Sequence, residues 1–216
     1  MVKVVVLDVD GTLMDTNYQH TEAWARALAD VGGPVPRAEV HRGIGKGSEI
    51  LISDFVDDED AAERVDELHA DIYMDLQQYA QVLPGAKELI ASLSGNGFQV
   101  WLVTSAKPEE LEKHLEKLEA EEKLAGIVNS SDVEQAKPAP DVFELALERA
   151  GIQANEAIAV GDSVWDVEAA KAAGVRTVAV LTGGAFGAEE LKEAGAIEVY
   201  EDCAALVDSG FPDWAR

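Results

Sequence analysis

Continuous apolar runs recur along the chain, and each ends in small or polar residues. The first spans residues 2–9 and ends in acidic residues followed by Gly11. Runs of this kind are typical of strands buried on both faces, as in a parallel sheet. Later runs predict five further strands, of which the last is the weakest: residues 98–103, 125–128, 157–160, 175–181 and 197–200.

Amphipathic patterns lie between these runs and predict helices. Residues 108–118 open with proline and two glutamates, which suit a first helical turn, and then repeat leucine on one face. Residues 84–93, 140–150 and 164–173 follow similar patterns. Strands and helices that alternate at this spacing predict an α/β fold with a doubly wound parallel sheet.

One long segment interrupts the alternation. Between Thr16 and Val82 the patterns predict helices over residues 20–31, 47–55 and 58–76, but no strand. The segment 41–47 within it is a glycine-dense, basic loop. We therefore expect residues 16–82 to form a helical insert in a core made of residues 1–15 and 83–216. Residues 209–216 are expected to form a loose tail.

Charge and cysteine content limit the location and the partners. A formal net charge of −25 and a pI near 4.3 disfavour binding to nucleic acid or anionic lipid. Cys203 is the only cysteine, which excludes an internal disulfide and fits a reducing compartment. No signal peptide or membrane-spanning run is recognisable. We expect a soluble cytoplasmic protein, either a monomer or a weak homodimer.

Polar residues collect where the predicted strands end, which is where open α/β sheets bind their ligands. Converging carboxylates repel one another unless a cation joins them or their pKa values rise. A ligand set made of oxygen atoms, without histidine or cysteine, favours Mg²⁺ over zinc. The residues concerned are Asp8, Asp10, Thr104, Ser105, Lys137, Asp162 and Asp166.

These residues supply the parts that phosphoryl transfer needs. A metal ion and Lys137 can neutralise the phosphate oxygens, so that a carboxylate can attack phosphorus and form an aspartyl-phosphate. A second acid can protonate the leaving oxygen and later deprotonate water. Asp8 and Asp10 suit these two roles, and Thr104 can donate a hydrogen bond to a phosphoryl oxygen.

Four segments, in order, resemble the four motifs of the haloacid dehalogenase-like superfamily. The DxDGT motif is matched by residues 8–12 and the GDxxxD motif by residues 161–166; residues 103–105 and 137–140 resemble the second and third motifs. The resemblance implies a Rossmann-like core with a helical cap inserted after the first motif. Superfamily dehalogenases lack the second acid, so the presence of Asp10 argues against carbon–halogen chemistry.

The same resemblance implies a role for each motif residue. Asp8 would be the nucleophile and a Mg²⁺ ligand. Asp10 would be the acid/base and would also give its backbone carbonyl to the metal. Asp162 would be a second carboxylate ligand, Asp166 would brace the site, and Lys137 would bridge Asp8 and the phosphate.

Three residues of the insert are candidates for substrate contact. His20 opens an amphipathic helix, where packing at a helix N-terminus is an equally good explanation. Arg42 and Lys46 lie in the glycine-dense loop of a very acidic chain, which favours substrate binding over ordinary surface charge.

Three functions follow, and the first is favoured. The first is a Mg²⁺-dependent phosphatase acting on a small phosphorylated metabolite, such as a phosphoglycolate-like or sugar phosphate. The second is a β-phosphoglucomutase-like phosphomutase, although such mutases carry arginine where Lys46 stands. The third is a non-enzymatic phospho-receiver module, which needs neither a cap of this size nor an acid such as Asp10.

Overall fold

A six-stranded parallel sheet forms the centre of the computed structural model, which describes residues 1–212. The strand order is β5-β4-β1-β6-β7-β8, so the first strand lies in the middle. All six predicted strands are confirmed: β1 (Val4–Leu7), β4 (Gln99–Val103), β5 (Gly126–Val128), β6 (Ala157–Gly161), β7 (Arg176–Val180) and β8 (Glu198–Tyr200). The predicted α/β fold with a doubly wound, Rossmann-like sheet is therefore correct.

Alternate residues of β1 serve two hydrophobic layers, as the period of two along a strand requires. Val5 and Leu7 pack with the helices on one face of the sheet, α5 (Ala86–Gly95), α6 (Pro108–Leu118) and α10 (Cys203–Asp208). Val4 and Val6 pack with those on the other, α7 (Asp141–Ala150) and α8 (Val164–Ala172). The short helix α9 (Ala188–Ala194) and α10 were not predicted.

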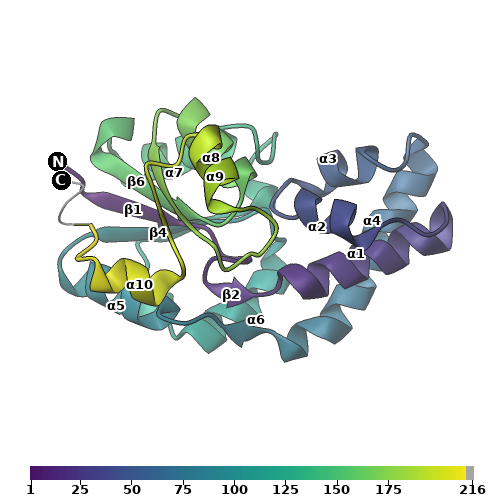
Figure 1. The fold of residues 1–216 in the computed structure, drawn as a ribbon, viewed down its shortest axis with the longest axis horizontal. Helices are drawn as coiled ribbons and strands as arrows, with labels where there is room; N and C mark the ends of the chain where they lie inside the picture. Colours follow the sequence, from purple (N-terminus) through teal and green to yellow (C-terminus); the bar gives the residue numbers. More distant parts are fainter. Residues whose placement is uncertain (213–216) are drawn as a thin grey trace.

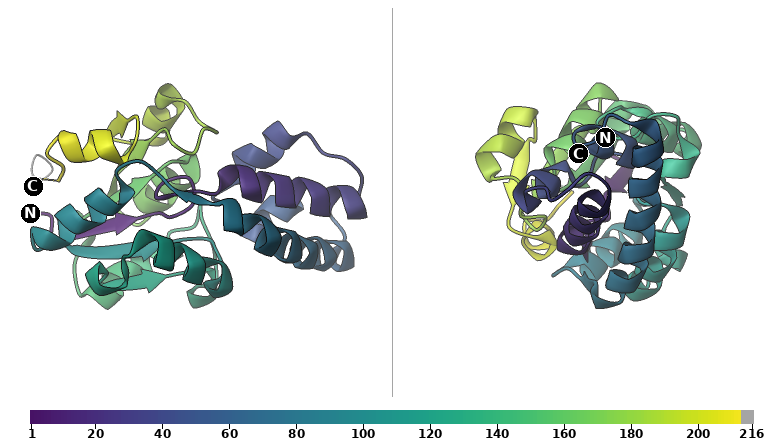
Figure 2. Two further views of the ribbon diagram at one scale, coloured as in Figure 1. Left: turned by 90° about the horizontal axis from the view of Figure 1, so that it is seen from below. Right: turned by 90° about the vertical axis from the view of Figure 1, so that its right-hand side faces the viewer.

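The inserted segment folds into helices with a hydrophobic cluster of their own. These are α1 (Asn17–Val31), α2 (Arg37–Gly43), α3 (Ser48–Ser53) and α4 (Glu59–Leu76). Trp24, Leu28, Val40, Leu51 and Val65 form the buried cluster between them. Figures 1 and 2 show these helices beyond one end of the sheet, far from the N-terminus. We call α1–α4 the cap; its limits at residues 16 and 82 stay a prediction.

Two details of the cap differ from the sequence-based expectation. Helix α2 includes residues 41–43, which we had expected in a loop. A two-residue strand, β3 (Gln81–Val82), pairs antiparallel with β2 (Met14–Asp15) where the chain leaves and re-enters the core. Strands of two residues carry no alternating pattern, so the sequence could not indicate them. Single-turn 3₁₀ helices complete the described chain: η1 (Gln77–Tyr79), η2 (Glu121–Lys123), η3 (Ser130–Asp132) and η4 (Ala154–Glu156).

The expectation of a loose tail is wrong where the chain is described. Phe211 is buried in the same hydrophobic cluster as β1 and α5, which fixes the chain just after α10. The rest of that prediction, residues 213–216, lies outside the described residues. Among the helices of residues 1–212, none combines the length and the apolar character needed to cross a bilayer. A cytoplasmic location stays a prediction.

Gly85, at the start of α5, provides a test of how the core is packed. Its φ is +77°, and a Cβ there would lie 2.1 Å from the backbone nitrogen of Ala204 in α10. Gly85→Ala should cost about 1 kcal/mol for the left-handed conformation and roughly 1–3 kcal/mol more because α5 and α10 must separate. Gly97→Ala is the matched control, since its φ is +82° but its Cβ would meet nothing within 4 Å. Equal losses of unfolding free energy for the two variants, measured by urea denaturation, would contradict this packing.

Candidate active site

Lys137 is a fully buried cation that joins two of the predicted site carboxylates. Its Nζ donates to Asp8 Oδ1 at 2.6 Å, to Asp166 Oδ1 at 2.7 Å and to the Val103 carbonyl at 3.2 Å. Burial alone would lower the pKa of Lys137, but the carboxylates of Asp166 and Asp8 outweigh it and raise this pKa. Lys137 therefore stays charged, and it links the carboxyl ends of β1 and β4 to the first turn of α8.

Asp162 reaches the same point from the end of β6. Thr12 Oγ1 donates to its Oδ1 at 2.9 Å, and Asn17 Nδ2 donates to its Oδ2 at 3.1 Å. Gly183 packs directly against this carboxylate, because a Cβ there would lie 1.6 Å from Asp162 Oδ2. Asp162 is thus held from several sides, and the loop after β7 must carry glycine at this point.

Three buried carboxylates form a cluster that fits a hard cation. Oxygen atoms of Asp8, Asp162 and Asp166 all lie within 4.8 Å of one another. Burial, together with the neighbouring acids, raises the pKa of Asp8 to about 7 and the pKa of Asp162 well above its ordinary value. Asp166 is already bound by Lys137 and by Ser163 Oγ at 2.6 Å. Asp8 and Asp162 are therefore the carboxylates that could hold Mg²⁺, with Asp166 behind them.

The side chain of Asp10 makes a different set of contacts. Thr16 Oγ1 donates to its Oδ1 at 2.6 Å, Thr104 Oγ1 donates to its Oδ2 at 3.3 Å, and His20 Nε2 lies 3.4 Å from Oδ1. Burial would raise the pKa of Asp10, but the hydrogen bond and charge of His20 outweigh it and lower this pKa. The pKa of His20 is raised in turn, against the effect of burial, by the same carboxylate. Asp10 and His20 form an ion pair.

A buried aromatic stack supports His20 from the cap side. Its ring stacks on Tyr73 with centroids 3.7 Å apart, and its Nδ1 lies 3.2 Å from His69 Nε2. The His69 ring stacks on Trp24, with centroids 3.6 Å apart. Burial and the charge of His20 hold the pKa of His69 well below its ordinary value, so the Nε2 atom of neutral His69 can accept a hydrogen bond from the Nδ1–H of His20. His20 therefore both packs against the aromatic residues of the cap and contacts Asp10.

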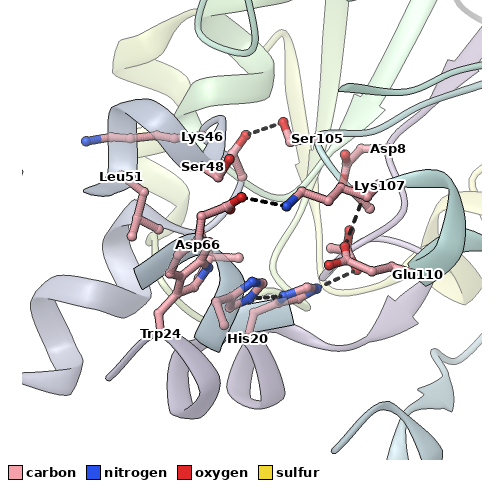
Figure 3. Close-up of a pocket in the computed structure, with 15 residues that line it drawn as sticks. Asp8, His20, Trp24, Lys46, Ser48, Leu51, Asp66, Ser105, Lys107 and Glu110 are labelled. Atoms are coloured by element: carbon pink, nitrogen blue, oxygen red, sulfur yellow. Dashed lines mark hydrogen bonds and ion pairs between the residues drawn. The ribbon is translucent and has the colours of Figure 1, made fainter. Parts of the chain in front are cut away.

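A cavity of about 60 Å³ lies between the cap and the core beside Asp8 and Asp10. Figure 3 shows two of its lining residues, Asp66 of α4 and Lys107 at the start of α6, joined by an ion pair with Nζ and Oδ2 2.7 Å apart. Ser105 Oγ donates to the Gly45 carbonyl at 3.1 Å, a second contact between core and cap. The cavity therefore has a wall of core residues and a wall of cap residues.

The two cations expected to bind substrate are each paired with an acid, and of the two only Lys46 lines the cavity. Arg42 Nη2 lies 2.8 Å from Glu190 Oε1, and its guanidinium lies over the ring of Phe186. Lys46 Nζ lies 2.6 Å from Asp54 Oδ2 and above the Trp165 ring. Figure 3 shows the Lys46 side chain directed away from the other labelled residues of the cavity. The structure brings together the remaining predicted residues: Asp8, Asp10, His20, Thr104, Ser105, Lys137, Asp162 and Asp166.

Several residues of the site were not anticipated from the sequence. Thr12, Thr16 and Asn17 donate hydrogen bonds to the carboxylates of Asp162 and Asp10. Thr12 is the last residue of the first motif, whereas Thr16 and Asn17 had no signal beyond being polar and close to it. His69 could have been noticed because histidine is rare in this chain, which contains four. Asp66, Lys107 and Glu110 line the cavity but had no local signal, because only the folded cap brings them together.

Comparison with known proteins agrees with this geometry. The haloacid dehalogenase-like hydrolase family model matches residues 2–174. A phosphoglycolate phosphatase of Rhodospirillum rubrum is 32% identical over 225 residues, covering 98% of this chain and 92% of that protein.

Solved structures have the same fold. A hydrolase from Pseudomonas syringae has a TM-score of 0.90 and 33% identity, covering 96% of this chain and 97% of its own. A β-phosphoglucomutase from Clostridium difficile has a TM-score of 0.84 at 19% identity, covering 100% of this chain and 99% of its own, which shows the fold alone. With its four motifs gathered at one end of the sheet, this chain belongs to the haloacid dehalogenase-like hydrolases.

Proposed function

We propose that this chain is a Mg²⁺-dependent phosphatase that hydrolyses a small phosphomonoester through an aspartyl-phosphate on Asp8. The observation that carries the proposal is the contrast between two acids at the end of β1. Asp8 is bound to Lys137 beside Asp162, whereas Asp10 is paired with His20. Two carboxylates in such different surroundings suit the separate roles of nucleophile and proton carrier. The phosphoglycolate phosphatase among the relatives supports a phosphatase.

Asp8 is the nucleophile in this scheme. Lys137 binds one of its oxygens and leaves the other to attack phosphorus, while the bond from phosphorus to the leaving oxygen breaks. Lys137 also holds Asp8 in one rotamer, which reduces the entropy cost of attack. Mg²⁺, when bound by Asp8, Asp162 and the backbone carbonyl of Asp10, would offset the negative charge of the phosphate. Thr104 and Ser105 lie at the end of β4, and their hydroxyls would donate to phosphoryl oxygens after turning away from Asp10 and from the Gly45 carbonyl, their present acceptors.

The Asp10–His20 pair holds the proton that the leaving oxygen needs. The pair has one exchangeable proton, which rests on His20 while Asp10 is ionised. We infer that this proton passes through Asp10 to the leaving oxygen. Asp10 then takes a proton from the water that attacks the aspartyl-phosphate, and Asp8 is released together with inorganic phosphate.

The phosphomutase is the weaker candidate. The β-phosphoglucomutase has the same fold, but a mutase must also grip a second phosphate. Arg42 and Lys46, the cations expected for that task, form ion pairs with Glu190 and Asp54. The phospho-receiver module is set aside, because the chain belongs to a hydrolase family and pairs its second acid with His20.

Mg²⁺ should control both activity and stability. EDTA should abolish turnover of p-nitrophenyl phosphate, and Mg²⁺ should restore it. The pKa of Asp8 is raised from 3.8 to about 7, so the folded protein binds a proton that the unfolded chain has lost in this range. The metal-free protein should therefore lose stability as the pH rises through this window. Because Mg²⁺ replaces that proton, it should raise the Tm more at about pH 8 than at about pH 5. Full activity after chelation, or equal Tm shifts, would contradict the assignment.

Substitutions should separate the two acids of β1. Asp8→Asn should abolish turnover and phosphoenzyme formation. Asp10→Asn should still form the phosphoenzyme but slow turnover by roughly 10²–10⁴-fold, and least for p-nitrophenyl phosphate, whose leaving group needs little protonation. Asp30→Asn, an exposed acid of α1, is the matched control and should behave like the wild type. Near-normal kcat in Asp8→Asn would show that the nucleophile lies elsewhere.

A product assay should separate the phosphatase from the phosphomutase. The protein is incubated with Mg²⁺, β-glucose 1-phosphate and a bisphosphate primer. The pairing of Arg42 and Lys46 predicts inorganic phosphate or no product, without glucose 6-phosphate. Efficient formation of glucose 6-phosphate, measured with a coupled dehydrogenase, would favour the mutase instead.

A further inference from the structure

Two consecutive residues, where the chain enters the cap, each bind one of the acids of the site. Thr16 Oγ1 donates to Asp10 Oδ1 at 2.6 Å, and Asn17 Nδ2 donates to Asp162 Oδ2 at 3.1 Å. Asp162 is one of the two carboxylates that could hold Mg²⁺, and it belongs to the core, whereas Asn17 is the first residue of the cap helix α1. A cap residue therefore touches a carboxylate of the candidate metal site.

The side-chain amide of Asn17 is buried and joins two acceptors. Its Nδ2 atom donates to Asp162 Oδ2 and also to the backbone carbonyl of Gly183 at 3.2 Å. A carbonyl only accepts hydrogen bonds, so the NH₂ group of the amide must be the end that faces both partners. Two glycines make room for this group, because a Cβ would lie 2.3 Å from Nδ2 at Gly11 and 2.8 Å from it at Gly183. An aliphatic side chain of the same size would take a donor away from both acceptors.

The Gly183 carbonyl is also bound by the second helix of the cap. His41 Nε2 lies 3.0 Å from this oxygen and must carry a proton, since the carbonyl can only accept. The next residue of α2, Arg42, donates through Nη1 to the Ala185 carbonyl at 3.0 Å. The loop between β7 and α9, residues 181–187, is therefore bound by both α1 and α2 of the cap.

The same loop packs tightly against the core side of the site. A Cβ at Gly183 would lie 1.6 Å from Asp162 Oδ2, so the backbone of the loop lies directly against that carboxylate. Thr182 Oγ1 donates to the Gly11 carbonyl at 2.6 Å, which ties the loop to the first motif as well. Close packing transmits displacements rather than absorbing them. A movement of the cap that shifts the Gly183 carbonyl must therefore disturb the orientation of Asp162.

From these contacts we infer that Asn17 is a positioning residue for Asp162 and makes the Mg²⁺ affinity of the site depend on the position of the cap. One N–H of Asn17 orients the carboxylate, and the other joins it to the carbonyl that His41 holds. Residues that orient a metal ligand without touching the metal typically change metal affinity by about 10–100-fold. The inference rests on the proposed function, because it takes Asp8 and Asp162 as the Mg²⁺ ligands.

The test measures the Kd of Mg²⁺ for the substrate-free protein by isothermal titration calorimetry, together with the Tm in EDTA. Asn17→Leu keeps the size of the side chain and removes its donors, so it should raise this Kd by about tenfold or more. Saturating Mg²⁺ should then restore most of the turnover of p-nitrophenyl phosphate, because the defect lies in metal binding. Asn155→Ala, which removes an exposed asparagine of η4, is the matched control and should leave the Kd unchanged.

Variants of His41 test the link to the cap. His41→Leu should raise the Kd of Mg²⁺ by about fivefold, although His41 touches no carboxylate of the site. His41→Gln should behave like the wild type, because its amide nitrogen can occupy the place of Nε2. Added to Asn17→Leu, the substitution His41→Leu should have almost no further effect, since the connection to Asp162 is already broken.

The outcomes separate this inference from the proposed function. If the wild-type protein binds no Mg²⁺, the metal assignment of the proposed function fails together with the inference. If it binds Mg²⁺ and Asn17→Leu binds it equally tightly, only the inference is wrong, and a lower Tm in EDTA would then show that Asn17 merely supports the fold. Equal effects of His41→Leu with and without Asn17 would contradict the link to the cap. Should Asn17→Leu fail to fold, Asn17→Ala serves, because it removes the same donors and should raise the Kd likewise.

Discussion

Lys137 occupies a position where a charged side chain would ordinarily be very unfavourable. Its ammonium group is fully buried, and it is compensated by Asp8, Asp166 and the Val103 carbonyl. Removing either partner would leave an uncompensated charge, which typically costs about 3–5 kcal/mol. The same ammonium fixes the position of Asp8 and balances part of the charge of the carboxylate cluster. The ends of β1 and β4 and the first turn of α8 are therefore held together by the group that the proposed chemistry also needs.

The ionisation of Asp10 depends on a separate set of contacts, which joins the core to the cap. Asp10 belongs to the core, whereas His20, His69, Trp24 and Tyr73 belong to α1 and α4 of the cap. Contact between Asp10 and His20 therefore requires the cap to lie close to the sheet. In the proposed mechanism this couples the position of the cap to the proton of the acid/base, while Asp8 and Lys137 stay in place within the core. Ser105 with Gly45 and Lys107 with Asp66 add further contacts between the two parts.

The core and its site residues were largely predictable, and the walls of the cavity were not. Asp8, Asp10 and Asp162 follow buried strands, and the rule that parallel strands end at one edge of a sheet brings them together without further information. The ammonium group of Lys46 could turn toward Asp54 or toward the cavity, because its side chain is flexible. No sequence pattern specifies which of the two it does. Asp66 and Lys107 are 41 positions apart and meet only because α4 returns beside α6. Contacts of this kind across the cavity depend on the folded cap, so no sequence pattern indicates them, and the assignment of Arg42 and Lys46 to substrate binding stays a prediction.

The central claim is that Asp8 carries the phosphoryl group, and chemical trapping tests it most directly. The enzyme is mixed with substrate and Mg²⁺, quenched in acid during turnover, and treated with borohydride, which reduces an acyl phosphate to an alcohol. Peptide mass spectrometry then locates the reduced residue. The account predicts homoserine in place of Asp8 and unmodified Asp10. Reduction at Asp10, or at no residue while a large fraction of the enzyme is in turnover, would contradict it.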